Sequence, residues 1–448
     1  MFSKVLIANR GEIALRVLRA CREMGIATVA VHSTADASSM HVRLADESVC
    51  IGPPAARDSY LNTQAILAAA EISRADAVHP GYGFLAENAA FAQMVEEHGL
   101  TFIGPTPEHI RIMGDKIAAK RTAIELGLPV VPGSEGVLAG EAEATAEARR
   151  LGFPVLIKAV AGGGGRGMTV VRDAGELRDA MRMARNEARL GFGDDRVYLE
   201  KFLDRPRHIE IQVLADTHGH VVHLGERDCS LQRRHQKVIE EAPSPVLDAA
   251  ERARIGMLVA DAMRKLGYRG LGTVEFLWQD NAFYFIEMNT RVQVEHPVTE
   301  LVTGIDLVRE QIRVAAGEKL GYRQNAVTFT GHAVECRVTA EDPQTLTPRA
   351  GRVTAYHPPG GPGVRVDSAL YAGYTVPPHY DSLIAKVIVH DKDRASALRR
   401  ADRALGECVI DGVPTNIPLL RALVTNGSVE RAEYDTNWLG RFLADWQG

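Results

Sequence analysis

Residues 153–171 read FPVLIKAVAGGGGRGMTVV, two apolar runs on either side of four consecutive glycines. Its apolar ends predict two strands, 153–160 and 169–171, joined by a glycine loop. Consecutive glycines let a backbone approach a polyphosphate closely, with N–H groups pointing at the oxygens. Lys158 before the loop and Arg166 within it favour phosphate covering over a plain surface hairpin. The loop lacks the GxxxxGK(S/T) pattern, which argues against a Walker-type site.

Two glutamates in a later apolar hairpin are candidate metal ligands. Glu275 lies in GTVEF and Glu287 in FIEMN, with a Gln-Asp-Asn turn between the two segments. Burying an acid within an apolar strand is costly unless the acid is paired or bound to a metal. With Asn289 they make an oxygen ligand set suited to Mg²⁺ (or Mn²⁺) on nucleotide phosphates. The alternative is a pair of outward-facing acids on a solvated strand.

The segment NTRVQVEHP, residues 289–297, follows directly. In an extended chain, Arg291, Gln293 and Glu295 point to one side. Arginine and glutamine can hold a small planar anion, and Glu295 could accept a proton from it. An exposed, salt-bridged strand is the other interpretation of this segment.

The run DCSLQRRHQK, residues 228–237, is densely basic. Such runs are often solvated and sometimes bind nucleic acid. The chain carries a formal net charge of −5, and the run has no interleaved aromatic residues, so nucleic acid is not expected. A pocket for a nucleotide and an anion fits better.

The first hundred residues alternate strand and helix patterns, which predicts βαβ units and a parallel sheet. The first turn is Asn9-Arg10-Gly11-Glu12 rather than GxGxxG, so a nicotinamide site is disfavoured. Further patterns predict strands at 209–214, 221–224, 273–278, 283–288, 333–338, 364–366 and 384–389, and helices at 249–266 and 394–408.

The bulk composition excludes several classes of protein. The five cysteines are scattered without a CxxC pair, which suggests neither a zinc site nor disulfides and fits a cytoplasmic location. No stretch approaches the roughly 20 apolar residues of a membrane span. We therefore expect a globular protein with neither a membrane nor a nucleic acid as partner.

These segments, in this order, resemble the biotin carboxylases of the ATP-grasp superfamily. The match also covers IANRGEIA (7–14), HPGYGFLAEN (79–88), MGDK (113–116) and GYTVPPHYDS (373–382), and so spans nearly the whole chain. The resemblance implies an α/β and α+β fold. Its parts would be a parallel-sheet N-terminal α/β (pre-ATP-grasp) domain (1–112), an ATP-grasp lid with a mobile glycine loop (113–197), the ATP-grasp core (198–330) and a C-terminal mixed β domain (331–448).

The resemblance also implies residue roles in ATP and metal binding. Lys116 and Lys158 would contact the phosphates, and Gly164 and Gly165 would cover them. The remaining ATP contacts would be Glu200, Lys201 and Leu203 at the adenine, with His208, Gln232, His235, Glu275 and Glu287. The metal ligands would be Glu275, Glu287 and Asn289.

The implied reaction is ATP-dependent C–N bond formation in two stages. Bicarbonate would bind Lys237, Arg291, Gln293 and the Val294 N–H, and attack the γ-phosphate with Glu295 as general base. The resulting carboxyphosphate would yield CO₂ and phosphate, and the phosphate would deprotonate biotin. Arg337 would stabilise the biotin enolate, because a fixed guanidinium suits an oxyanion.

The expected partners also follow from the resemblance. The chain has no Met-Lys-Met triplet, so biotin would arrive on a separate biotin carboxyl carrier protein, with separate carboxyltransferase subunits. Acetyl-CoA is favoured as the final acceptor, in fatty-acid synthesis, with other acyl-CoAs, pyruvate and 2-oxoglutarate left open. A homodimer would use Arg19, Glu23 and Arg365, and Trp438 would lie near the adenine pocket. The alternatives are another ATP-grasp ligase, such as a carbamoyl-phosphate-forming one, and a regulatory subunit without turnover.

Overall fold

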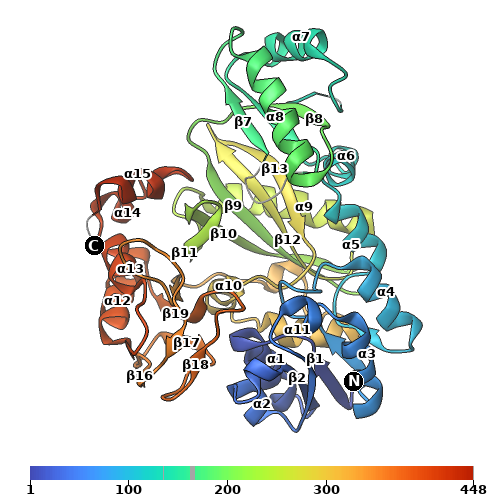
Figure 1. Ribbon diagram of the computed structural model, residues 1–448, viewed down its shortest axis with the longest axis vertical. Helices are drawn as coiled ribbons and strands as arrows, with labels where there is room; N and C mark the ends of the chain where they lie inside the picture. Colours follow the sequence, from blue (N-terminus) through green and yellow to red (C-terminus); the bar gives the residue numbers. More distant parts are fainter. Residues whose placement is uncertain (135, 162–166, 447–448) are drawn as a thin grey trace.

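The computed structural model describes residues 1–134, 136–161 and 167–446. Figure 1 shows an N-terminal lobe in blue, an upper lobe in teal and green, and a C-terminal lobe in orange and red, arranged around central green and yellow strands. The predicted phosphate-covering residues Gly164 and Gly165 lie outside the described residues, as does Arg166.

The N-terminal lobe contains the predicted parallel sheet. Its elements are β1 (Lys4–Ile7), α1 (Gly11–Glu23), β2 (Ala27–Ser33), η1 (Thr34–Asp36), α2 (Met40–Leu44), β3 (Glu47–Gly52), η2 (Ala56–Asp58), α3 (Thr63–Ser73), β4 (Ala77–His79), α4 (Ala89–Glu97), β5 (Thr101–Phe102) and α5 (Pro107–Gly114). The strands pair in the order β3-β2-β1-β4-β5, all parallel. Val5 and Ile7 enter one hydrophobic cluster and Leu6 and Ala8 another, so both sheet faces are covered.

The first turn of this sheet differs from the first turn of a dinucleotide-binding sheet. In dinucleotide-binding sheets an acidic residue near the end of the second strand binds a ribose hydroxyl. Here Asp36, just after β2, accepts hydrogen bonds from the Arg10 guanidinium at 2.6 and 2.8 Å and from the Tyr60 hydroxyl at 2.6 Å. The Asp36 carboxylate thus already binds Arg10 of the first turn and Tyr60.

The upper lobe carries the glycine-loop hairpin. Its elements are α6 (Lys116–Glu125), α7 (Glu141–Leu151), β6 (Val155–Ala159), β7 (Met168–Val171), α8 (Leu177–Phe192) and β8 (Val197–Lys201). The antiparallel order is β7-β6-β8, which confirms the predicted strand–loop–strand. We call the part from α7 to β8 the lid.

A single antiparallel sheet joins the central strands to the C-terminal lobe. The elements of this half are β9 (Arg207–Ala215), β10 (Val221–Arg233), β11 (Gln236–Ala242), α9 (Ala249–Leu266), β12 (Gly270–Gln279), β13 (Ala282–Asn289), α10 (His296–Thr303), α11 (Leu307–Ala315), η3 (Gln324–Ala326), β14 (His332–Thr339), β15 (Gly351–Arg352), β16 (Ala355–His357), β17 (Val364–Ser368), β18 (Thr375–Val376), β19 (Leu383–Asp391), α12 (Arg394–Glu407), β20 (Val409–Asp411), α13 (Ile417–Val424), α14 (Gly427–Glu430) and α15 (Trp438–Asp445). The sheet order is β13-β12-β9-β10-β11-β14-β19-β17, so it runs through the β11–β14 pair across residue 330. The four domain boundaries themselves stay a prediction.

Three local expectations differ from the structure. The basic run lies mostly in β10, which continues to Arg233 instead of ending near residue 224. The predicted last helix, α12, is followed by three more, because Pro418 begins α13 rather than breaking it. Residues 290–295 are a turn and not an extended strand, since Glu295 caps α10 and the His296 N–H bonds the Gln293 carbonyl.

None of the helices formed by the described residues combines the length and the apolar character that a membrane crossing needs.

Candidate active site

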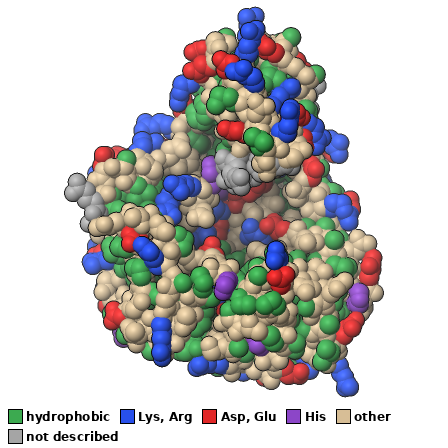
Figure 2. All heavy atoms as spheres, viewed as in Figure 1, with side chains coloured by type: hydrophobic (Ala, Val, Ile, Leu, Met, Phe, Trp, Pro, Cys, Tyr) green, Lys and Arg blue, Asp and Glu red, His purple; other side chains and the backbone are tan. Residues whose placement is uncertain are grey.

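A hollow lies between the upper lobe and the two lower lobes, with acidic side chains visible on its floor (Figure 2). We call the charged cluster on strands β9 to β14 and on the turn after β13 the floor; its members are His208, Glu210, Arg227, Lys237, Glu240, Glu275, Glu295 and Arg337. The floor-facing residues predicted from the sequence converge there, although they come from distant parts of the chain.

Lys237 is the central cation of this floor. Its ammonium donates to Glu210 at 2.5 Å, to Glu275 at 3.0 Å and to Glu295 at 2.5 Å. Burial alone would lower the pKa of Lys237, but Cys229 and the three carboxylates outweigh it and raise that pKa well above its ordinary value. Lys237 therefore stays charged and keeps the three glutamates ionised.

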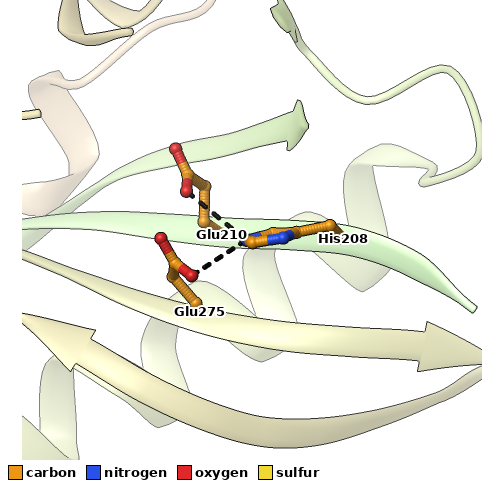
Figure 3. A group of neighbouring side chains, drawn as sticks. All are labelled: His208, Glu210 and Glu275. Carbon is orange, nitrogen blue, oxygen red and sulfur yellow. Dashed lines mark ion pairs between the residues drawn. The ribbon is translucent and has the colours of Figure 1, made fainter. Parts of the chain in front are cut away.

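His208 closes the same cluster from β9 (Figure 3). Its Nε2 lies 3.1 Å from Glu275 and 3.7 Å from Glu210. The ligand atoms of His208, Glu210 and Glu275 all lie within 4.8 Å of one another, so this group could hold a metal ion. Burial alone would lower the pKa of His208, but Glu275 and Glu210 outweigh it and the net shift is upward.

The predicted metal ligands share the β12–β13 hairpin. Glu275 and Glu287 stand directly opposite each other, and the Asn289 side-chain amide donates to Glu275 at 2.8 Å. Burial and the neighbouring Glu275 raise the pKa of Glu287. Two facing carboxylates that resist joint ionisation fit a cation-binding pair, because a divalent ion would stabilise both charges. Oxygen ligands of this kind suit Mg²⁺.

The turn after β13 brings the anion-binding candidates together. Gln293 donates to Glu275 at 2.9 Å and accepts from Arg227 at 2.6 Å. Arg291 donates to Asn289 at 2.8 Å and to Glu87 at 2.7 Å. The turn thus ties Gln293 and Arg291 to the predicted metal ligands, and their role in holding an anion stays a prediction.

Glu295 sits between two cations at the end of this turn. It accepts from Lys237 at 2.5 Å and from Arg337 at 2.8 Å, and it is 2% exposed. Burial acts to raise the pKa of Glu295, but Lys237 and Arg337 outweigh it and the net shift is downward. The carboxylate is therefore ionised and able to accept a proton.

The predicted phosphate contacts meet at the junction of the lid and α6. Lys158 and Lys120 both donate to Glu200, at 2.9 and 2.8 Å. Burial and the nearby Lys158 ammonium lower the pKa of Lys116. Two ammonium groups that repel each other form a site where an anion such as a phosphate is stabilising.

The predicted adenine contacts are only partly grouped. Lys201 is held in β8 by its ammonium, which donates to the carbonyls of Gly152 and Phe153, and by its N–H, which bonds the Pro132 carbonyl. Leu203 follows β8 in the connection to β9. Gln232 is buried in β10, while His235 is exposed in the β10–β11 turn.

The C-terminal tail reaches the same connection. The Thr436 N–H bonds the Pro206 carbonyl at 2.9 Å, and the Asn437 amide lies 3.5 Å from the Asp204 carbonyl. Trp438 comes next and stacks on Phe442 at 5.2 Å between ring centroids. Its neighbours in the tail thus lie beside the residues that follow Leu203.

Comparison with known proteins agrees with this geometry. Residues 1–110 match the family model of the biotin carboxylase N-terminal domain, and residues 335–441 match that of the C-terminal domain. Residues 115–323 match the ATP-binding domain of the carbamoyl-phosphate synthase L chain. The chain is 57% identical over 444 residues to a biotin carboxylase of Pseudomonas aeruginosa, and the aligned part covers 99% of each chain. The chain belongs to the biotin carboxylase family.

Solved biotin carboxylases share the whole fold. The βγ-ATP complex of the Campylobacter jejuni enzyme is 48% identical, with a TM-score of 0.94, and covers 98% of this chain and 99% of that one. The biotin carboxylase domain dimer of Hydrogenobacter thermophilus 2-oxoglutarate carboxylase, solved with MgADP, ADP and bicarbonate, is 48% identical. It has a TM-score of 0.93 and covers all of both chains.

The predicted interface residues of this biotin carboxylase family member lie on α1 and β17, two elements that contact each other. Arg19 is exposed on α1, and Glu23 at the end of the same helix pairs with Arg309. Arg365 pairs with Glu300 at 2.6 Å within the chain. Their role in a dimer stays a prediction.

Sequence reasoning missed charged residues that organise the floor, among them Glu210 and Arg227. Glu210 alternates with apolar neighbours in the β9 segment HIEIQ, where polar groups fall on one face, and that period-2 pattern was a usable signal. Arg227 is fully buried and donates to Glu210, Gln212 and Gln293. It lies one residue before the basic run, and only pairing of β9 with β10 reveals its place.

Proposed function

We propose that this protein carboxylates biotin at the expense of ATP, with bicarbonate as the carbon source and Mg²⁺ (or Mn²⁺) as the metal. The observation that carries this proposal is the Glu295 carboxylate held between Lys237 and Arg337 beside the predicted metal ligands. That arrangement offers an ionised base, two cations for small anions and a set of carboxylates for a metal–nucleotide complex.

ATP would lie between the lid and the floor. Lys116 and Lys158 would bind its phosphates, and the glycine loop would cover them. A metal ion on Glu275, Glu287 and Asn289 would supply charge neutralisation at the phosphates. The adenine contacts proposed for Glu200, Lys201, Leu203, His208, Gln232 and His235 complete the nucleotide site.

In the first stage, a bicarbonate oxygen attacks the γ-phosphorus. The bond to the ADP oxygen breaks, and the bicarbonate proton passes to Glu295. Lys237, Arg291, Gln293 and the Val294 N–H would hold the bicarbonate. Because Glu295 has a lowered pKa, it is in its proton-accepting form before the substrates arrive.

In the second stage, the C–O bond of carboxyphosphate breaks to release CO₂ and phosphate. The phosphate takes the proton of the biotin ureido nitrogen, and that nitrogen then forms a bond to CO₂. Arg337 stabilises the negative oxygen of the ureido enolate, because a guanidinium keeps its charge and offers directed N–H donors. Exclusion of water by the lid would protect carboxyphosphate from hydrolysis.

The partners proposed for this reaction are a biotin carboxyl carrier protein, separate carboxyltransferase subunits and a second copy of this chain. Acetyl-CoA is the proposed final acceptor, which would place the chain in malonyl-CoA and fatty-acid synthesis. Support for the homodimer comes from the similar domain of Hydrogenobacter thermophilus 2-oxoglutarate carboxylase, which was solved as a dimer. Arg19, Glu23 and Arg365 are the contacts proposed for it. The cytoplasmic location stays a prediction.

Bicarbonate-dependent ATP hydrolysis, stimulated by free biotin, tests this function. Glu295→Gln should reduce that turnover by at least about 100-fold, in the range of general acid–base catalysis, while ATP still binds. Phosphate release and nucleotide titration measure the two properties. A glutamine variant with near-wild-type turnover would contradict the base assignment. Wild-type protein without biotin stimulation would favour another ATP-grasp ligase or a regulatory subunit.

A further inference from the structure

Lys386 is a fully buried lysine whose ammonium reaches the back of the catalytic turn. Its side chain is 0% exposed on β19. The ammonium donates to the Val294 carbonyl at 2.7 Å, and it lies 3.2 Å from Glu12 and 3.7 Å from Asp367. Burying an ammonium is costly without partners of opposite charge, and Glu12 and Asp367 are those partners here.

The Val294 carbonyl, which accepts the hydrogen bond from Lys386, lies next to Glu295 in the chain. It belongs to the same peptide plane as the N–H of Glu295, and Glu295 is the proposed base. The turn 290–295 is neither strand nor helix, so sheet hydrogen bonds do not define its path. A cation on this carbonyl fixes the orientation of the peptide, and with it the direction in which the Glu295 side chain leaves the backbone.

Two anchors from different lobes hold Lys386 itself. Glu12 comes from α1 in the N-terminal lobe and accepts a hydrogen bond from the Tyr82 hydroxyl. Asp367 comes from β17 and is bound at both oxygens by Arg365, at 2.9 and 2.8 Å. Glu12 and Tyr82 belong to segments 7–14 and 79–88, which the proposed nucleotide and bicarbonate contacts leave without a role.

We propose that Lys386 is a positioning residue for Glu295, which it holds through the Val294 carbonyl. The inference rests on the proposed function, because Glu295 is the base only in that function. Among the described residues, the Lys386 ammonium bonds the Val294 carbonyl and pairs with Glu12 and Asp367, and not with a proposed nucleotide contact or metal ligand. Its loss displaces the base and the Val294 N–H, so it impairs use of bicarbonate and leaves nucleotide affinity intact.

Lys386→Met tests this role in the full-length protein. The kcat/KM for bicarbonate should fall by about 10- to 100-fold, the usual range when a supporting contact of an active-site group is lost. The dissociation constant of ADP, measured by calorimetry, should stay within about twofold, because its contacts are untouched. The wild-type enzyme, assayed in parallel, reports separately on the proposed function.

A matched control removes a comparable ion pair elsewhere. Arg394→Met breaks the contacts of Arg394 with Glu241, at 2.6 and 3.0 Å, in the same lobe but away from the turn. It should leave kcat/KM for bicarbonate within about twofold of wild type, because distant sites act independently. If Lys386→Met matches this control, or if ADP affinity falls in parallel with activity, the positioning role is overturned.

A milder variant keeps the proposal testable if Lys386→Met does not fold. Glu12→Gln preserves the shape of an anchor but removes its charge, so it loosens Lys386 without deleting it. The kcat/KM for bicarbonate should then fall by about threefold or more, with unchanged ADP affinity, as expected of a supporting contact. Wild-type kcat/KM in a folded Glu12→Gln protein would overturn the proposal.

Discussion

The floor of the active site and the lid use charged residues in opposite ways. On the floor, Glu210 and Arg227 are each 0% exposed and bound to each other. On the lid, the Arg182–Asp179 pair leaves more than two thirds of each side chain in water. Buried, fixed charges act strongly on a reacting group, whereas solvated pairs contribute little.

This difference indicates that the floor, rather than the lid surface, sets the geometry of the charges that act on the substrates. The floor charges neutralise one another before any substrate arrives, so their geometry is set by folding and needs little reorganisation during the reaction. The lid has its own apolar core, which includes Val155, Ile157 and Leu199, and its surface charges are not part of that core. Substitutions on the floor should therefore affect stability and activity together, and those on the lid surface should affect neither.

Lys237→Met should give the largest effect. It leaves three buried carboxylates without their shared cation, which should lower the free energy of unfolding by about 3–5 kcal/mol. Bicarbonate-dependent ATP hydrolysis should be lost as well. Denaturant titration and the hydrolysis assay measure the two outcomes.

Lys4→Met is the control for Lys237→Met. Lys4 pairs with Glu47 at the surface, so this change should cost at most about 1 kcal/mol. A similar loss of stability in both variants would contradict the contrast between buried and solvated charges.

Arg337→Ala should come next, with an effect concentrated in the second stage of the reaction. Carboxylation of free biotin should fall by about 100-fold or more, the usual loss of an oxyanion-stabilising donor. Hydrolysis of ATP without biotin should fall less. Because Arg337 helps to lower the pKa of Glu295, the acid limb of the pH profile should also move to higher pH. Equal losses in the two assays would argue against the enolate role.

The sequence predicted the floor residues better than their backbone. Glu275 and Glu287 were predicted to lie on the two strands of one hairpin, because two apolar strands flank a short turn. The structure adds that they stand directly opposite each other. The extended course of 290–295 was wrong, since Pro297 starts a helix whose cap is Glu295. Local patterns fix strands and hairpins, but the path of an irregular turn depends on distant contacts such as Lys386.

The residues that sequence reasoning missed share one property. Glu210, Arg227, Glu240 and Lys386 act through partners on other strands, many residues away. In the sequence Glu210 and Lys386 stand between apolar neighbours, whereas Arg227 and Glu240 lie beside other charged residues. None of the four carries a motif of its own. Their roles follow only from the order in which β9, β10, β11, β14 and β19 pair. Long-range pairing is the information that the linear pattern lacks.

Glu240→Gln should give a smaller, pH-dependent effect. Burial raises the pKa of Glu240 from 4.5 to about 7, although Arg337 opposes the shift. Between these values the folded protein binds a proton that the unfolded chain has released, so stability falls as pH rises. Glutamine cannot titrate, so the fall should flatten by up to about 1.4 kcal/mol per pH unit. Denaturant titrations at pH 5, 6, 7 and 8 measure it, and unchanged slopes would contradict it.

Arg182→Ala on the lid should give the smallest effect of the four. The Arg182 guanidinium lies 3.1 Å from Asp179 one turn earlier in α8, and both side chains are largely in water. Water solvates either charge almost as well as the partner does, so the free energy of unfolding should change by at most about 0.5 kcal/mol. Turnover and ADP affinity should stay at wild-type values. A loss of turnover without a loss of stability would show that the lid surface takes part in the reaction. It would contradict the contrast between floor and lid.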